Sequence, residues 1–102
     1  MTLTELPIAI DSGDLALFCR ERGIRRLALF GSILREDFSP DSDVDMLVEY
    51  LPGRHPGLML FRQQDELAAR LQRRVDLHTP ASLSRHFSSD VLAASLPIYE
   101  QA

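Results

Sequence analysis

The sequence predicts an α/β fold in which helices pack on a small mixed sheet of about three to four strands. Segments with helical spacing of apolar residues alternate along the chain with short apolar runs of strand length. Hydrophobic residues make up 45% of the chain, which is enough for a packed core. The length of 102 residues is typical of one domain, so we expect residues 1–102 to form a single unit.

The first predicted elements are a helix over residues 14–22 and a strand over residues 25–32. Asp11 or Ser12 can accept hydrogen bonds from the free amides at the start of the helix. Gly23 can adopt the left-handed conformation that ends a helix. The apolar run that follows stops abruptly at a glycine, which is typical of a buried strand.

The middle of the chain predicts a strand, a helix and another strand. A turn or two of helix over 32–37 leads, through a segment dense in turn-forming residues, to a strand over 43–50. The loop over 51–57 contains two prolines and two glycines. Apolar residues then recur at near-helical spacing over 58–72, and a third strand is predicted over 73–79.

The last segment, residues 80–102, is predicted to be helical. Pro80 stands at a suitable first helical position, and we expect short helices before a frayed end. The predicted order of elements is therefore helix, strand, helix, strand, helix, strand, helix.

Charge and composition exclude several classes of function. Fifteen acidic residues oppose eleven basic ones, and the net charge of −4 argues against broad binding of nucleic acid. Every basic residue is an arginine, which excludes a Walker-type phosphate loop and lysine Schiff-base chemistry. The arginines gather in 20–26 and 70–74, either as solvated helix ends or as an anion- or partner-docking face. A single cysteine, Cys19, excludes an internal disulfide framework.

The sequence predicts neither a membrane span nor a signal peptide. No window approaches the roughly 18–20 apolar residues that a span needs. The amino-terminal segment lacks the basic start and the cleavage site of a secretory signal. We therefore expect a cytoplasmic protein without a membrane partner.

Two carboxylates stand at the start of the strand over 43–50. Asp43 and Asp45 are two residues apart, so both point to one face of the sheet, while Val44 and Met46 point to the other. Neighbouring carboxylates repel each other unless a cation lies between them. Mg²⁺ prefers oxygen ligands and often binds one or two carboxylates together with substrate phosphates. Two such ions can stabilise both the attacking and the leaving oxygen of a nucleotidyl displacement.

A third carboxylate, Asp76, lies inside the strand over 73–79. Val75 and Leu77 are expected to face the core, which places Asp76 and His78 on the other face. If this strand lies beside the strand over 43–50, Asp76 completes a cluster of three carboxylates. It could then bind a metal ion and act as a base or orient one. For His78 we expect a structural hydrogen bond.

A candidate phosphate site precedes the carboxylates. Gly31 allows close approach to the backbone, and Ser32 adds a hydroxyl at the start of a helical turn. Arg35 follows within one turn and can reach the same phosphates. Taken alone, a Gly-Ser pair is usually a helix cap, and a pair of aspartates two residues apart is often a solvated strand start. A calcium loop starting at Asp41 fails, because its sixth and twelfth positions lack glycine and glutamate.

Taken together, these residues resemble a known family. The segment GSILREDFSPDSDVDMLV is similar to the signature of the DNA polymerase β-like nucleotidyltransferases, and RRVDLHT resembles their third-aspartate strand. The short chain resembles the minimal nucleotidyltransferases, the MNT partners of HEPN ribonuclease toxins. This resemblance implies the nucleotidyltransferase fold. It also implies site roles for the following residues: Gly31, Ser32 and Arg35 on the nucleotide phosphates, and Asp43, Asp45 and Asp76 as catalytic ligands of two Mg²⁺ ions.

The resemblance also implies a function. The expected reaction transfers AMP from ATP to a hydroxyl group, most simply a tyrosine of a HEPN toxin, and neutralises that toxin. An acidic antitoxin also has the charge sign that suits a basic toxin. One alternative is an antitoxin that acts by binding alone, since Glu36 stands where many relatives have glycine. Another is a free-standing transferase acting on a small hydroxylated molecule.

Overall fold

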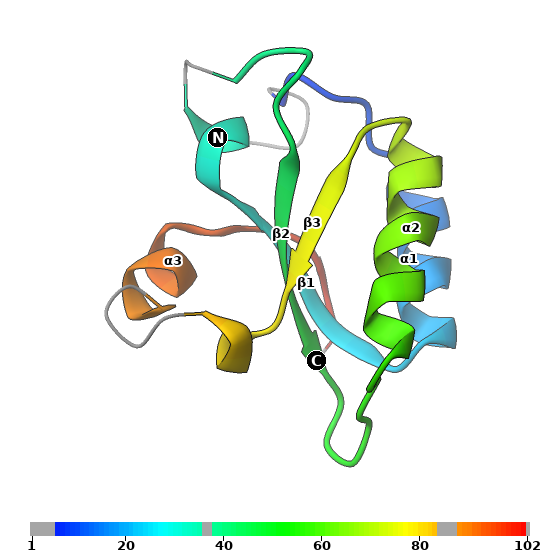
Figure 1. Ribbon diagram of the computed structural model, residues 1–102. Coiled ribbons are helices and arrows are strands. Elements are labelled where there is room, and N and C mark those ends of the chain that lie inside the picture. The colour runs from blue at the N-terminus through cyan, green and yellow to red at the C-terminus, as the bar shows by residue number, and fades with distance from the viewer. Residues whose placement is uncertain (1–5, 36–37, 84–87, 102) are drawn as a thin grey trace.

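The computed structural model describes residues 6–35, 38–83 and 88–101, and within them the chain forms one four-stranded mixed sheet (Figure 1). The strand order is β3-β2-β1-β4, in which β2 pairs antiparallel with β1 and parallel with β3. β4 pairs antiparallel with the other edge of β1. The strands are β1 (Ile24–Phe30), β2 (Val44–Tyr50), β3 (Val75–His78) and β4 (Leu96–Glu100).

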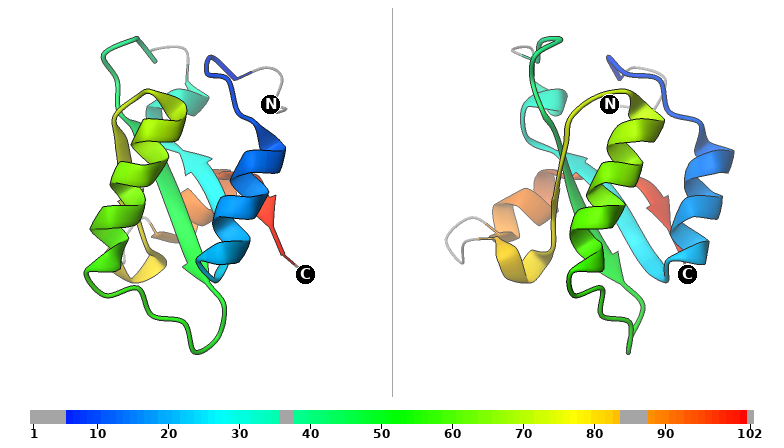
Figure 2. Two further views of the ribbon diagram at one scale, coloured as in Figure 1. Left: turned by 90° about the vertical axis from the view of Figure 1, so that its right-hand side faces the viewer. Right: turned by 45° about the vertical axis from the view of Figure 1, so that its right-hand side comes forward.

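Two long helices cover one face of the sheet. α1 (Ser12–Glu21) and α2 (Met59–Leu71) lie side by side on this face (Figure 2), whereas α3 (Ser88–Ala94) lies on the opposite side (Figure 1). Two short 3₁₀ helices, η2 (Gly31–Leu34) and η3 (Pro80–Ser82), follow β1 and β3. The α/β fold class is confirmed. Among the described residues, none of the helices combines the length and the apolar character needed to traverse a bilayer.

The main core lies between the sheet and the α1–α2 layer. Its central side chains come from alternate strand positions and from the inner sides of the helices: Leu15, Phe18, Cys19, Ile24, Leu27, Leu29, Val44, Met46, Val48, Leu67 and Leu77. On β2 this alternation sends Val44, Met46 and Val48 into the core, as predicted, so Asp45 is turned to the opposite face. Each fully buried aliphatic side chain contributes about 1.5–3 kcal/mol through the hydrophobic effect.

The ends of α1 follow the predicted local chemistry. The Asp11 carboxylate accepts a hydrogen bond from the Asp14 amide at 3.1 Å and caps the first turn. Gly23 ends the helical segment with a φ of +69°. The helix then turns directly into β1, which begins at Ile24.

Arginines of the 20–26 group pair with carboxylates. Arg22 forms a forked contact with Glu66, at 3.3 Å and 2.7 Å, and so ties α1 to α2. Arg25 and Arg26 both contact Glu49 on β2. These three side chains therefore form structural ion pairs rather than an anion-docking face, and those of Arg22 and Arg26 are largely buried rather than solvated.

The carboxyl-terminal segment was predicted to be helical, and this prediction is wrong for residues 96–100. They form β4, which extends the sheet beside β1, with Leu27 paired with Tyr99. Pro97 lacks an amide hydrogen and lowers strand propensity, but β4 is an edge strand, where proline is tolerated. Ile98 joins the core, and this burial, which depends on the whole fold, stabilises the strand.

Candidate active site

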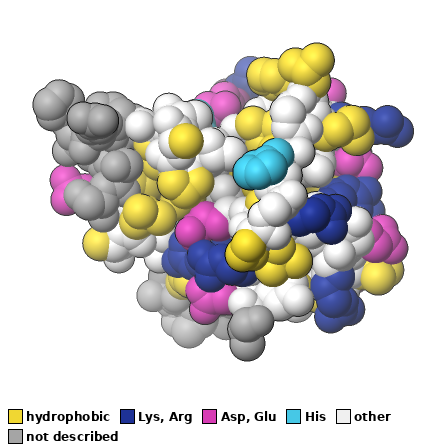
Figure 3. Space-filling view, turned by 90° about the horizontal axis from the view of Figure 1, so that it is seen from below, with side chains coloured by type: hydrophobic (Ala, Val, Ile, Leu, Met, Phe, Trp, Pro, Cys, Tyr) yellow, Lys and Arg dark blue, Asp and Glu magenta, His cyan; other side chains and the backbone are white. Residues whose placement is uncertain are grey.

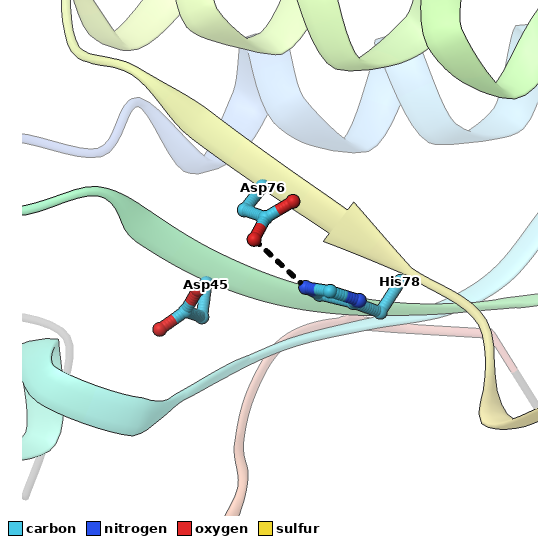
Figure 4. Close-up of side chains that lie close together, drawn as sticks. All are labelled: Asp45, Asp76 and His78. Atoms are coloured by element: carbon cyan, nitrogen blue, oxygen red, sulfur yellow. Dashed lines mark ion pairs between the residues drawn. The ribbon is translucent and has the colours of Figure 1, made fainter. Parts of the chain in front are cut away.

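The parallel pairing of β2 and β3 brings two carboxylates together. Asp45 on β2 and Asp76 on β3 are direct register partners, so the adjacency of these strands, which the sequence analysis assumed, is present. His78 lies two residues further along β3 on the same face (Figure 4). One ligand atom from each of Asp45, Asp76 and His78 can be chosen so that all three lie within 4.8 Å of one another. The three atoms are therefore close enough to bind one metal ion.

His78 is held in place by two neighbours. Its Nε2 lies 3.1 Å from Asp76 Oδ2, the contact drawn as a dashed line in Figure 4. Phe30, the register partner of Asp45 on β1, packs edge-on against the imidazole, with ring centroids 5.6 Å apart. The predicted polar contact of His78 is present, and the same side chain also belongs to the ligand group.

Gly31 lies directly against Asp45. Its φ of +79° is in the left-handed region, and a Cβ atom placed there would collide with Asp45 Oδ2 and lie 3.2 Å from Asp45 Cγ. Glycine is therefore required both by the backbone conformation and by the nearby carboxylate. The sequence predicted close approach of a phosphate at this position, and the structure shows close approach of the Asp45 side chain.

Ser32 is the second residue of η2, and Arg35 is the residue that ends this helix, from where its charge acts on Asp45. This four-residue 3₁₀ helix is shorter than the turn predicted over 32–37, and Glu36 lies outside the described residues. The Arg35 amide donates to the Ser32 carbonyl at 2.9 Å and closes the turn. Because so short a helix has little macrodipole, phosphate binding here would depend on backbone amides, the Ser32 hydroxyl and the Arg35 charge.

The electrostatics of the cluster centre on Asp45. Burial is the largest cause that raises the pKa of the Asp45 carboxyl, and the charge of Asp76 raises it further. His78 lowers the pKa, Asp43 raises it and Arg35 lowers it, each by less than burial and Asp76 raise it. The net pKa is raised above the ordinary value, so the negative charge of Asp45 is poorly compensated. A bound cation would relieve this repulsion.

Asp43 lies at the edge of this group. Its Oδ1 forms an ion pair with Arg74 Nε at 2.9 Å, and both side chains are exposed. Arg74 also donates a hydrogen bond to the Asp41 carbonyl. The charge of Asp43 raises the pKa of Asp45. Among the described residues, however, Asp43 does not belong to the ligand group of Asp45, Asp76 and His78. Arg74 was noted from the sequence as part of the arginine group over 70–74, but its pairing with Asp43 was not predicted.

A separate hollow lies at the other end of β2. Tyr50, His55, Met59 and Gln63 are among the residues that line about 270 Å³ of space there. The molecule seen from below, in Figure 3, shows basic, acidic and hydrophobic side chains interleaved on its surface. His55, in the loop after β2, is exposed. The Asp45 cluster lies near the start of β2. This pocket, in contrast, lies at the end of β2, around Tyr50.

The mixed sheet therefore carries Asp45 and Asp76 on adjacent strands, beside the Gly31–Ser32 turn that follows β1. The family model described as "Nucleotidyltransferase domain" matches residues 14–99. The chain belongs to this nucleotidyltransferase family.

Several known proteins are similar to this chain. Protein adenylyltransferase MntA of Thermococcus cleftensis is 41% identical over 94 residues, which cover 90% of this chain and 91% of that protein. A solved minimal nucleotidyltransferase is 30% identical, with a TM-score of 0.70 and coverage of 84% of this chain and 87% of that one.

Two solved toxin–antitoxin complexes share the fold at lower identity. One contains AMP-PNP, and its matching chain is 20% identical with a TM-score of 0.67, covering 90% of this chain and 75% of that chain. The other is a tri-AMPylated Shewanella oneidensis HEPN toxin with an MNT antitoxin, at 20% identity and a TM-score of 0.59, covering 88% and 70%. At 20% identity, these two matches show a shared fold and nothing further.

Proposed function

We propose that this protein transfers AMP from ATP to a hydroxyl group, a tyrosine, on a HEPN-type toxin and thereby neutralises the toxin. The observation that carries the proposal is the register pairing of Asp45 with Asp76, beside the positive-φ Gly31. The names of similar proteins support it, since they include a protein adenylyltransferase and an AMPylated HEPN toxin bound to an MNT antitoxin.

The carboxylates would hold Mg²⁺. Asp45 and Asp76 supply the hard oxygen donors that this ion prefers. Asp43 directly precedes β2, its charge acts on Asp45, and it would be a further oxygen donor. The raised pKa of Asp45 also fits a cation site, because its charge lacks full compensation. When bound, two such ions would neutralise phosphate charge and stabilise the attacking and leaving oxygens.

The other residues would position the nucleotide and the acceptor. Gly31 and Ser32 would contact the phosphates, and Arg35 would neutralise part of their charge. In the transfer, the acceptor oxygen forms a bond to the α-phosphorus while the bond from that phosphorus to the pyrophosphate oxygen breaks. The hydroxyl proton passes to a base, for which Asp76 stands in a suitable place, and pyrophosphate leaves.

A partner protein would supply the acceptor. The described residues form one sheet and its helices, and no further layer among them is present to hold a large acceptor. AMP-PNP in a related toxin–antitoxin structure supports ATP as the donor. The net charge of −4 suits a basic partner.

The test combines this protein, its genetically neighbouring partner, Mg²⁺ and ATP labelled at the α-phosphate. The D43A/D45A double variant serves as the inactive comparison. We expect label on the partner with the natural protein and none with the variant. An unlabelled partner that the variant still silences would contradict the enzyme and indicate an antitoxin acting by binding. Label appearing only on a small hydroxylated molecule would instead indicate a free-standing transferase.

A further inference from the structure

We propose that His78 is a direct ligand of the metal ion bound by Asp45 and Asp76, and that the site therefore prefers a first-row transition metal such as Mn²⁺ to Mg²⁺. This inference rests on the metal site of the proposed function and adds a ligand to it. The resulting donor set consists of two carboxylate oxygens and one imidazole nitrogen, contributed by two adjacent strands.

The distances suit a shared ion. Ligands at about 2.1 Å from an octahedral ion lie about 3 Å apart when adjacent and about 4.2 Å apart when opposite. The Asp76 Oδ2 to His78 Nε2 distance of 3.1 Å is a direct ion-pair contact in this structure, and it is also close to the separation of two adjacent ligands. All three donor atoms lie within 4.8 Å of one another, so small side-chain rotations would bring them onto one ion.

The imidazole is oriented for this role. Phe30 packs edge-on against the ring, at an interplanar angle of 62°, and restricts its rotation. His78 side-chain exposure is 29%, so the ring is accessible to an ion without being free in solvent. In Figure 4, Nε2 is the ring nitrogen that points toward Asp76.

Asp43 lies outside the group of three ligand atoms. Its carboxylate forms an exposed ion pair with Arg74 at 2.9 Å, so it does not supply the third donor atom in this structure. His78 completes the group with Asp45 and Asp76.

The chemistry of the donors then determines the preferred ion. Mg²⁺ favours oxygen donors, whereas imidazole favours first-row transition metals. A mixed oxygen and nitrogen set shifts the preference from Mg²⁺ toward first-row transition metals, of which Mn²⁺ is a paramagnetic member that also accepts oxygen donors.

The test uses Mn²⁺ as the probe, with the full chain and no nucleotide. Spin-echo modulation in electron paramagnetic resonance detects a nitrogen bound to Mn²⁺, and titration of the free-ion signal gives the affinity. We expect nitrogen modulation in the natural protein and its loss in His78→Ala. Mn²⁺ affinity should fall by about 10–100-fold in that variant, at least the loss seen when outer-shell partners are removed. Mg²⁺ affinity, measured by competition, should change little.

His55→Ala is the matched control, since His55 is exposed in the loop beyond the other end of β2. This variant should keep both the modulation and the affinity. Absence of nitrogen modulation in the natural protein, or its persistence in His78→Ala, would overturn the inference. Label transfer with Mg²⁺ would persist in either case if the proposed function is correct, so the two failures are distinguishable.

Discussion

Gly31 and Asp45 are in direct contact, so that no side chain could be added at residue 31 without displacing the carboxylate. Gly31 ends β1 and starts η2, and Asp45 is the second residue of β2. The turn and the carboxylate therefore form one structural unit. This unit connects the candidate phosphate site with the candidate metal site.

Gly31→Ala is expected to abolish nucleotidyl transfer. The added Cβ would force Asp45 out of place, and displacement of a catalytic group by about 1 Å can cost 10²-fold in rate. The left-handed backbone would add a stability loss of about 1–2 kcal/mol. Label transfer and urea denaturation measure the two effects.

The matched control for this prediction is Gly53→Ala. Gly53 has a similar φ of +82°, but a Cβ there meets nothing within 4 Å. It should show the backbone penalty and keep its activity. Equal activities of the two alanine variants would contradict a role for the Gly31–Asp45 contact.

Asp45→Asn is expected to stabilise the metal-free protein at neutral pH, by about 0.5–2 kcal/mol, while it abolishes transfer. Burial and Asp76 raise the pKa of Asp45, so the folded state is penalised whenever this carboxyl is charged. The penalty is fully present above the folded pKa and is relieved as pH falls toward the unfolded pKa. The stability gain should therefore shrink in acid, as measured by denaturation at several pH values. Asp14→Asn, on the exposed side of α1, is the control and should not stabilise the protein. If it raised the free energy of unfolding as much as Asp45→Asn does, the stabilisation could not be assigned to loss of the Asp45 charge.

Glu66→Gln is expected to destabilise the fold by about 0.5–1 kcal/mol at pH 7. The hydrogen bond from Arg22 is the largest cause that lowers the pKa of Glu66. A lowered folded pKa gives stability that is present above the unfolded pKa and lost as pH falls through the folded pKa. The difference in free energy of unfolding between the natural protein and Glu66→Gln should thus disappear in strong acid. Glu21→Gln removes a longer, more exposed contact of the same arginine, at 3.5 Å, and should have a smaller effect.

Cys19 is expected to resist thiol reagents in the native protein. The side chain is fully buried, and burial raises the pKa of its thiol to about 12. At pH 8 only about one thiol in 10⁴ would then be ionised. A chromogenic disulfide reagent should report no reaction until the chain is unfolded by guanidinium, and one equivalent afterwards. Rapid reaction of the native protein would show that the α1–sheet core opens readily.

Local patterns predicted much of the site because strand alternation alone determines which side chains share a face. Asp45 and Asp76 were identified in this way, opposite the buried Val44 and Leu77. Pairing of β2 with β3 was assumed from the sequence and is confirmed by their register.

Other features depend on contacts between distant segments and left little local signal. β4 contains Pro97 and is stabilised as a strand by burial of Ile98 against the rest of the core. Arg74 gave no sign that it would pair with Asp43, since the two are brought together only when β3 docks beside β2. The contact of Gly31 with Asp45 likewise requires the β1–β2 register.

The most direct test of the account replaces Asp45 and Asp76 singly by asparagine and measures label transfer from α-labelled ATP to the partner. Asp14→Asn, in the helix layer on the other face, is the control. The account predicts losses of about 10²-fold or more for Asp45→Asn and Asp76→Asn, and unchanged transfer for the control. Retained transfer in both Asp45→Asn and Asp76→Asn would contradict the central claim that this paired cluster performs the reaction.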